Sequence, residues 1–159
     1  MIELAVLNAL PAREFGATLG GIFEHSPWVA ERAAADRPFS SRLELLDRMR
    51  AVVQSATLEE QLALIRAHPK LGARGRSRAM LTAASAKEQR CAGLDACSDE
   101  EFAQLLRLND AYVEKFAFPF ILAVRGHDPA SIMRTCERRL QNTPPIERQA
   151  ALREIGMIG

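Results

Sequence analysis

The fold is decided by residues 98–124, SDEEFAQLLRLNDAYVEKFAFPFILAV. Ser98 and Glu101 have the spacing of a capping box at the start of a helix. The side chains expected to face inward from this helix recur every three or four positions: Phe102, Leu105, Leu106, Asn109, Tyr112 and Phe116. The pattern stops near Ala117, and Pro119 with the apolar run to Val124 indicates an extended or irregular buried strip. The stretch therefore predicts the longest helix of the chain, followed by a segment whose backbone amides lack helical partners.

Similar start signals recur before and after this stretch. Ser41 with Glu44, and Thr57 with Glu60, repeat the capping-box spacing, and each precedes an amphipathic run. Further helix starts are expected at Pro11, Ser26-Pro27, Asp128-Pro129 and Thr143-Pro144. The helix after Pro11 is expected to carry Phe15, Leu19, Ile22 and Phe23, and the last helix Ile146, Ala150 and Ile155. We therefore predict an all-α fold, a single domain over residues 1–159 with about eight helices and one irregular extended apolar segment.

Composition narrows the possible functions. The 159 residues, 48% hydrophobic and 26% charged, suffice for one domain with its own core. The formal net charge of +1 gives no electrostatic footprint for nucleic acid or an anionic membrane. Cys91, Cys97 and Cys136 form no C-x-x-C pair, so we expect a reducing cytoplasm and neither a disulfide framework nor a zinc site. We also expect no membrane span and no secretory signal.

A candidate active site centres on His68, which directly precedes Pro69. Because a proline disfavours the helical conformation of the residue before it, His68 is expected at the end of a helix. Ser85, Glu88 and Gln89 have the i, i+3, i+4 spacing that places side chains on one face of a helix. The imidazole of His68 suits a general acid or base, and the Glu88 carboxylate would orient it if the two are close.

Each part of this site also has a simpler structural explanation. His68 could bind carbonyl groups at its helix end, and Ser85 with Glu88 could be one more capping box. If Thr82 is the cap instead, the polar groups lie near a helix N-terminus, where an anionic ligand group is favoured. The strip around Phe118–Phe120 could serve only core packing, although its free amides could also bind ligand carbonyls.

Other chemistries have weaker support in the sequence. His25 and His127 lie in turn-like settings, and we assign them no role. The three histidines lack the spacing of metal ligands, so metal-free chemistry is expected. A hydrolase with Ser85 as nucleophile is a weaker hypothesis, because the sequence around Ser85 is not that of a nucleophile elbow.

A set of motifs along the chain resembles one known family. In chain order the motifs are His68-Pro69-Lys70-Leu71, Leu81-Thr82 with Ser85, Glu88 and Gln89, Leu108-Asn109 with Tyr112, and Phe116 to Phe120. Their order and spacing resemble the 2-oxo-4-hydroxy-4-carboxy-5-ureidoimidazoline (OHCU) decarboxylase family, over almost the whole chain from Leu7-Asn8 to Asn142. Members of that family convert OHCU to (S)-allantoin in urate degradation.

The resemblance implies an all-helical fold, no cofactor, a homodimer and a small ureidoimidazoline as substrate. It implies that His68 is the catalytic histidine, with Glu88 as its partner. The substrate contacts it implies are Pro69, Ser85, Ala86, Lys87, Glu88, Gln89, Phe120, Ile121, Leu122, Ala123 and Val124.

Three positions differ from the usual family pattern. Lys70 stands where an acidic residue is general, Ala84 where glutamate is common, and Ala117 where glycine usually precedes Phe-Pro-Phe. These differences leave a second hypothesis open, a helical ureide-binding or regulatory module that keeps the pocket and performs no chemistry. Release of CO2 separates the two hypotheses.

Overall fold

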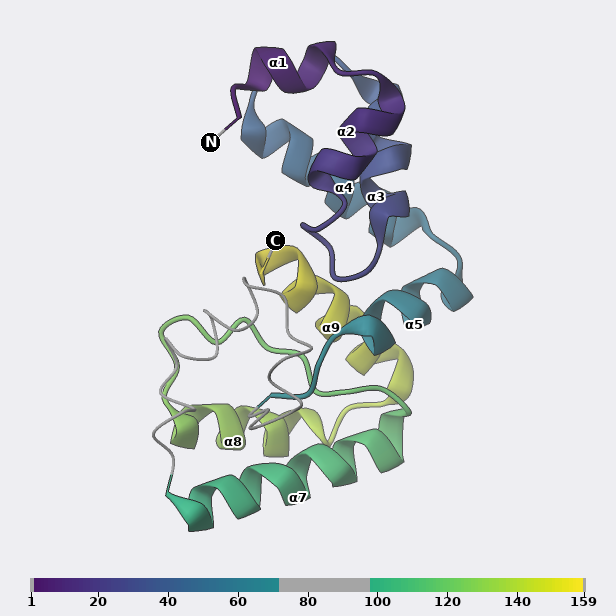
Figure 1. Cartoon of the computed structure of the whole chain (residues 1–159). Coiled ribbons are helices and arrows are strands. Elements are labelled where there is room, and N and C mark those ends of the chain that lie inside the picture. The colour runs from purple at the N-terminus through teal and green to yellow at the C-terminus, as the bar shows by residue number, and fades with distance from the viewer. Residues whose placement is uncertain (1, 72–97, 159) are drawn as a thin grey trace. The chain divides into compact units, whose positions relative to one another are not determined.

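A computed structural model describes residues 2–71 and 98–158 of the chain. Within these residues every regular element is helical, with eight α-helices and one short 3-10 helix (Figure 1). The predicted all-α class and helix number are therefore confirmed. The chain divides into two compact units, residues 1–67 and residues 68–158, and each is described by itself. A single domain over residues 1–159 stays a prediction.

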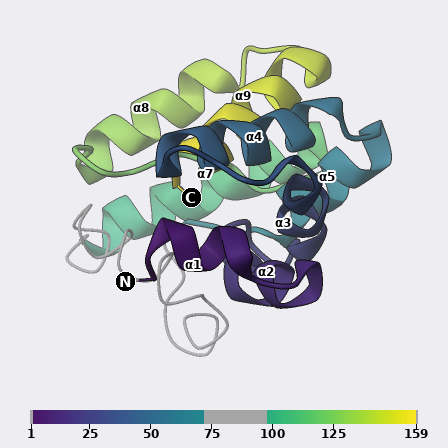
Figure 2. The same cartoon turned by 90° about the horizontal axis from the view of Figure 1, so that it is seen from above.

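The N-terminal unit contains six helical elements. These are α1 (Leu4–Ala9), α2 (Ala12–Leu19), α3 (Pro27–Ala33), the 3-10 helix η1 (Ala34–Asp36), α4 (Arg42–Ser55) and α5 (Leu58–Ala67). Helix α3 packs against both α2 and α4 (Figures 1 and 2). Phe15, Phe23, Val29 and Met49 are almost completely buried, so the core of this unit is apolar.

The C-terminal unit contains the predicted longest helix, α7 (Asp99–Phe116), together with α8 (Pro129–Arg139) and α9 (Pro144–Ile158). Helix α7 packs against both α8 and α9. The chain between α7 and α8, the green trace in Figure 1, is irregular from Phe118 to Val124, and all of these residues except Ala123 are buried. The predicted extended apolar strip is confirmed, and "the strip" below means residues 118–124.

Local capping explains why the helices begin where the sequence predicts. The side chain of Ser98 accepts the Glu101 N–H, and the Glu101 carboxylate accepts the Ser98 N–H in return. Thr57 with Glu60 makes the same reciprocal pair, with N–O distances of 3.2 and 3.0 Å. Such bonds satisfy N–H groups that the first helical turn leaves unpaired.

Two details of the predicted pattern are wrong. Helix α2 ends at Leu19, before Ile22 and Phe23, with Gly20 as the residue after its last turn. Leu106, which the pattern predicts to face inward, is 43% exposed on α7. Neighbouring positions on a helix point about 100° apart, so a partly apolar pattern does not fix which of two neighbours faces inward.

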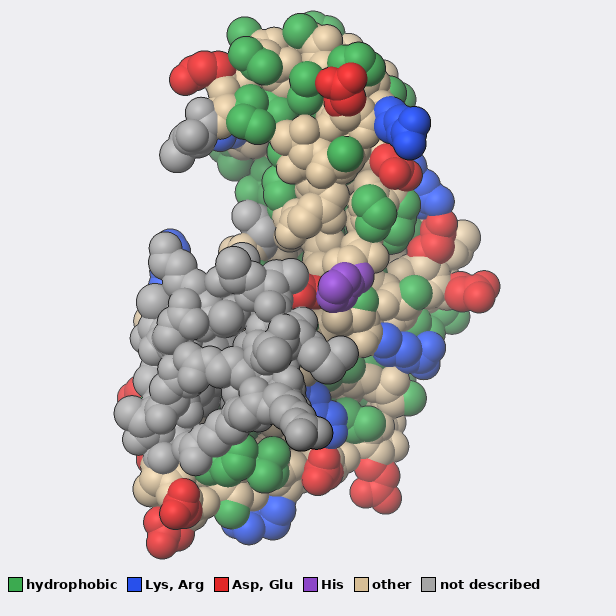
Figure 3. Space-filling model, in the orientation of Figure 1, with side chains coloured by type: hydrophobic (Ala, Val, Ile, Leu, Met, Phe, Trp, Pro, Cys, Tyr) green, Lys and Arg blue, Asp and Glu red, His purple; other side chains and the backbone are tan. Residues whose placement is uncertain are grey.

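The surface carries no strong charge pattern on the face drawn in Figure 3, where acidic and basic side chains of each unit are interspersed. Among the described helices, none is both long and apolar enough to cross a membrane.

Candidate active site

His68 lies directly after the last residue of α5, as the sequence predicts. The residue is buried, with 8% of its surface exposed. The segment that follows is tied to the middle of α7. Asn109 donates from Nδ2 to the Leu71 carbonyl over 3.1 Å, and Lys70 Nζ lies 3.0 Å from Asp110 Oδ1. The positive charge of Lys70 is therefore paired with a carboxylate of α7.

The second predicted group of site residues cannot be placed against His68. Ser85, Ala86, Lys87, Glu88 and Gln89 fall outside the residues that the structure describes. The meeting of the His68 imidazole with the Glu88 carboxylate therefore stays a prediction.

The strip is packed around the ring of Tyr112. The Tyr112 ring centroid lies 5.2 Å from that of Phe120 and 6.0 Å from that of Phe118, both in edge-on geometry. Phe116, at the end of α7, lies 4.7 Å from Tyr112 and stacks on Phe118 at 5.8 Å. These aromatic contacts fix the strip against α7 and exclude water from that side.

Two side chains hold the backbone of the strip. Arg139 on α8 donates from Nη1 to the Ile121 carbonyl over 2.6 Å. The Ala123 N–H donates to Oε2 of Glu154 on α9 over 2.9 Å. The expectation that all strip amides are free is therefore wrong for Ala123, because a carboxylate already accepts its proton.

An extended backbone predicts that the groups between these anchors point to the opposite side. In an extended chain, the C=O of one residue and the N–H of the second residue after it share a side, and the residue between them faces the opposite side. The bonds made by Ile121 and Ala123 fit this alternation. Among residues 2–71 and 98–158, no acceptor is found for the N–H of Phe120 or of Leu122, although both residues are buried. Buried amides are almost always hydrogen-bonded, so these two amides are candidates for ligand binding.

A buried polar network that the sequence analysis missed lies behind the strip. Oε1 of Glu147 lies 2.7 Å from Arg139 Nε and 2.5 Å from Arg139 Nη2, and it also accepts the Tyr112 hydroxyl. Asn142 Nδ2 donates to the second Glu147 oxygen over 2.6 Å. Burial raises the pKa of Tyr112 well above its ordinary value, although the Arg139 charge acts in the opposite direction. Tyr112 therefore remains a neutral donor to Glu147.

A signal for this network was present in the sequence. Glu147 shares the inward face of α9 with Ala151, Leu152 and Ile155, and a charged residue within an apolar stripe is almost always paired. Cys136, on the inward face of α8 beside this network, is a buried thiol whose pKa burial raises to about 12. It is therefore an inert core residue rather than a nucleophile.

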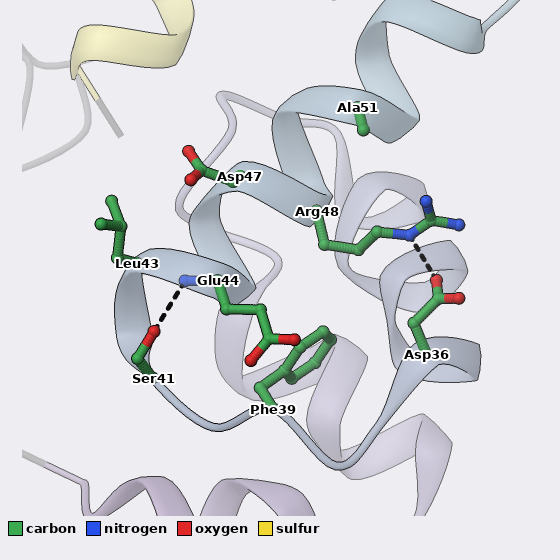
Figure 4. A pocket seen from close by; sticks show the side chains of 8 residues that line it. All are labelled: Asp36, Phe39, Ser41, Leu43, Glu44, Asp47, Arg48 and Ala51. Atoms are coloured by element: carbon green, nitrogen blue, oxygen red, sulfur yellow. Dashed lines mark hydrogen bonds and ion pairs between the residues drawn. The ribbon is translucent and has the colours of Figure 1, made fainter.

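A surface hollow of about 490 Å³ lies in the N-terminal unit and holds none of the predicted site residues (Figure 4). Its lining comes from the segment before α4 and from α4 itself: Asp36, Phe39, Ser41, Leu43, Glu44, Asp47, Arg48 and Ala51. Several of its polar groups bond to one another, with Arg48 Nε 2.5 Å from Asp36 Oδ2 and the Glu44 N–H 3.0 Å from Ser41 Oγ. The hollow is therefore a poor candidate for the active site.

No candidate metal centre accompanies the His68 segment or the strip. Within the described part of the chain, no three His, Cys, Asp or Glu side chains are grouped to hold a metal ion. Fold and site together define an all-helical protein with a buried imidazole and a clamped backbone strip, an arrangement that suits a small polar ligand.

Comparison with known proteins assigns the family. The family model described as OHCU decarboxylase matches residues 8–159. A 2-oxo-4-hydroxy-4-carboxy-5-ureidoimidazoline decarboxylase of Haloferax volcanii is 43% identical over 99% of this chain and 91% of its own length. A solved structure of an (S)-allantoin synthase superposes with a TM-score of 0.78 at 29% identity, covering 99% of this chain and 51% of that one. The chain belongs to the OHCU decarboxylase family, a family of carboxy-lyases.

Some relatives are much longer proteins. The uric acid degradation bifunctional protein of Bacillus sp. (strain TB-90) is 44% identical over 99% of this chain, which spans 31% of that relative's length. The chain thus corresponds to about a third of a two-function protein and to nearly the whole of the Haloferax volcanii decarboxylase.

Proposed function

We propose that this protein decarboxylates OHCU to (S)-allantoin in urate degradation, and that His68 handles the proton that sets the handedness of the product. The proposal rests on one observation, the state of the strip in a chain of the OHCU decarboxylase family. The strip is buried, and Arg139 and Glu154 make hydrogen bonds to its backbone at Ile121 and Ala123. The N–H groups of Phe120 and Leu122 have no acceptor among the described residues. A planar ureidoimidazoline, rich in carbonyl oxygens, supplies the acceptors that such amides require.

The reaction needs proton handling more than a cofactor. Loss of CO2 breaks the bond between the hydroxylated ring carbon and its carboxylate. The electron pair of that bond forms a C=C bond to the ureido-bearing carbon, and the electrons of the former C=N bond pass to nitrogen, which takes up one proton. The hydroxyl then loses its proton to become a carbonyl, and the ureido-bearing carbon gains one. Each OHCU anion therefore yields one CO2 and one allantoin and consumes one proton.

One-sided delivery of the last proton makes the product chiral. In this scheme His68 delivers or relays that proton, and Glu88 orients the imidazole and the ureido group. Strip amides, with Ser85 and Gln89, fix the ring so that one face is presented to His68. Fixed dipoles in a dry pocket stabilise the charge that develops as CO2 leaves.

The binding-module hypothesis loses part of its basis. It rested on Lys70, Ala84 and Ala117. Lys70 pairs with Asp110, and Ala117 is the left-handed cap that ends α7. Each of these two residues thus has a structural role, which supports the catalytic hypothesis over the binding module. Ala84 lies outside the described residues.

A coupled assay tests the proposal. OHCU is generated from urate with urate oxidase and hydroxyisourate hydrolase, and circular dichroism follows the rate and the enantiomeric excess of allantoin with and without this protein. We expect rapid CO2 release with an excess of the S enantiomer. His68→Asn and Glu88→Gln should each lower turnover by about 100-fold or more, because general acid–base catalysis contributes on that order.

His25→Asn is the matched control for the histidine substitution. His25 is 67% exposed and has a φ angle of 48°, which asparagine tolerates well. The control should keep wild-type activity. If His68→Asn yields (S)-allantoin at the wild-type rate and excess, the role given to His68 is wrong, and if the wild-type protein releases no CO2, the proposed activity is wrong. Sedimentation of the same proteins tests the homodimer that the family resemblance implies.

A further inference from the structure

We propose that Arg139 and Glu147 are positioning residues for substrate binding, which together hold the strip so that the amides of Phe120 and Leu122 face the ligand. This inference rests on the proposed function, because it concerns the geometry of the same strip. Neither side chain is required to touch the substrate.

The guanidinium of Arg139 links the Glu147 carboxylate to the backbone of the strip. Its Nε and Nη2 bind Glu147 at 2.7 and 2.5 Å, and its Nη1 binds the Ile121 carbonyl at 2.6 Å. The guanidinium is planar and rigid, so a carboxylate that holds two of its nitrogens also sets the direction of the third. The same group lies over the ring of Phe120, 4.9 Å from the centroid. Arg139 thus contacts the strip at two successive residues.

Glu147 is itself fixed by three parts of the chain. Its side chain is fully buried and bonds to Tyr112 of α7, Arg139 of α8 and Asn142 in the turn before α9. Any displacement of these helices relative to one another would therefore be transmitted through Glu147 and Arg139 to the Ile121 carbonyl. The amide of Leu122 belongs to the same peptide group as that carbonyl, and a peptide group is planar, so the direction of one fixes the direction of the other.

A role in stability alone explains this pair poorly. The cost of removing two charges from water offsets much of their attraction, and well-packed apolar residues often stabilise a core as well or better. An apolar pair, however, cannot donate a hydrogen bond to the Ile121 carbonyl. The geometry of the network is therefore explained better by the orientation of the strip than by the free energy of unfolding.

An apolar replacement separates the two roles. Glu147→Leu alone removes the closer of the two carboxylates that face the buried Arg139 charge, leaving Glu154 Oε1 at 3.9 Å from Nη1, and should destabilise the protein. The triple variant Tyr112→Phe/Arg139→Met/Glu147→Leu removes the charges and the hydroxyl together, and it should recover a large part of the lost stability in urea unfolding. Its KM for OHCU should nevertheless remain about tenfold or more above the wild-type value, with a smaller change in kcat, because the strip binds the ring before and during the reaction.

Two further variants and one further measurement complete the design. Arg139→Lys keeps the charge beside Glu147 but cannot reach both partners, so its KM should also rise. Arg138→Met, an exposed neighbour on α8, is the matched control and should keep the wild-type KM. Amide hydrogen exchange of residues 118–124 should be faster in the triple variant than in the wild-type protein, and this readout does not depend on turnover.

The outcomes are distinct. A stable triple variant with wild-type KM and wild-type exchange in the strip overturns the positioning role. If the triple variant does not fold, Arg139→Lys decides, because a wild-type KM in that variant overturns the proposal and a raised KM supports it. A wild-type protein that releases no CO2 counts against the proposed function, whereas active enzyme with unchanged KM in the variants counts against this inference alone.

Discussion

The two units of this protein differ in the burial of their arginine–carboxylate pairs. In the N-terminal unit these pairs lie at the surface: the side chains of Arg32 and Glu60 are 49% and 31% exposed, and those of Arg48 and Asp36 are 47% and 38% exposed. In the C-terminal unit, the side chains of Arg139 and Glu147 are 7% and 0% exposed. Exposed pairs are hydrated and screened and contribute little. A buried pair is costly to form and specifies one geometry.

The difference coincides with the location of the candidate site. His68 begins the C-terminal unit, and the strip lies within it. Every predicted site residue that the structure describes therefore belongs to the unit with the buried Arg139–Glu147 pair. The N-terminal unit has a largely apolar core and the hollow of Figure 4, several of whose polar groups bond to one another.

The largest effect expected from this comparison is that of Glu147→Ala. Removing the carboxylate leaves the Arg139 charge, the Tyr112 hydroxyl and a cavity in the core, which should lower the free energy of unfolding by about 3–5 kcal/mol. Arg32→Met, which breaks an exposed pair of the N-terminal unit, should leave the urea midpoint almost unchanged. Equal shifts of the midpoint in the two variants would contradict the distinction between the units.

Asn109→Ala should have the next largest effect. Asn109 is 1% exposed, and its loss leaves the Leu71 carbonyl without its donor, at a cost of about 1–3 kcal/mol. Turnover of OHCU should fall by more than the loss of folded protein explains, because the segment that carries His68 loses its hydrogen bond to α7. The neighbouring change Asp110→Asn removes only the exposed pair with Lys70, and it should alter neither urea unfolding nor turnover appreciably. If Asp110→Asn lost turnover and Asn109→Ala did not, the residue that holds the His68 segment on α7 would be Asp110 rather than Asn109.

The hydroxyl of Tyr112 gives a smaller, pH-dependent effect. Tyr112→Phe should cost about 1 kcal/mol near neutral pH, because Glu147 keeps Arg139 and Asn142 as partners. Burial raises the pKa of Tyr112 in the folded protein, so above the ordinary tyrosine pKa of about 10 the unfolded chain loses a proton that the folded chain keeps. The folded state then binds more protons than the unfolded state, and this contribution to stability falls as pH rises.

The chain's only tyrosine is Tyr112, which makes this effect measurable. Urea unfolding of wild type and Tyr112→Phe from pH about 8 to about 11 should show that the difference in stability shrinks above pH about 10. A difference that stays constant through this range would mean that the phenol is not held in its neutral form by the fold.

The same contrast explains how far the sequence could predict this structure. Capping boxes and helix-start prolines act within one turn of helix, and the helices that begin after Ser98, Thr57 and Asp128 confirm them. The strip was predictable because Pro119 and an unbroken apolar run exclude an amphipathic helix. The position of His68 at a helix end followed from the proline beside it.

What could not be predicted depends on contacts between helices. Arg139 and Glu147 are eight positions apart on different helices, and although the apolar stripe of α9 indicates a partner for Glu147, the sequence does not show which residue it is. Their pairing, and the bond from Arg139 to the Ile121 carbonyl, exist only once α7, α8 and α9 are packed. For the same reason the pattern did not predict that the amide of Ala123 is taken by Glu154. The network that supports the strip was therefore not predicted, and the candidate site itself stays a prediction.

The smallest expected effect concerns Ala117, where the family pattern usually has glycine. Ala117 ends α7 with a φ angle of 60°, in the left-handed region that a β-carbon disfavours. Ala117→Gly should relieve this strain and, after the greater freedom of glycine in the unfolded chain is subtracted, stabilise the protein by about 0.5–1 kcal/mol. Because Ala117 directly precedes the strip, a more stable α7 end should leave the KM for OHCU the same or lower. A loss of stability in urea unfolding would show that the backbone at this position is not held in the left-handed conformation, and that α7 passes into the strip by a different turn.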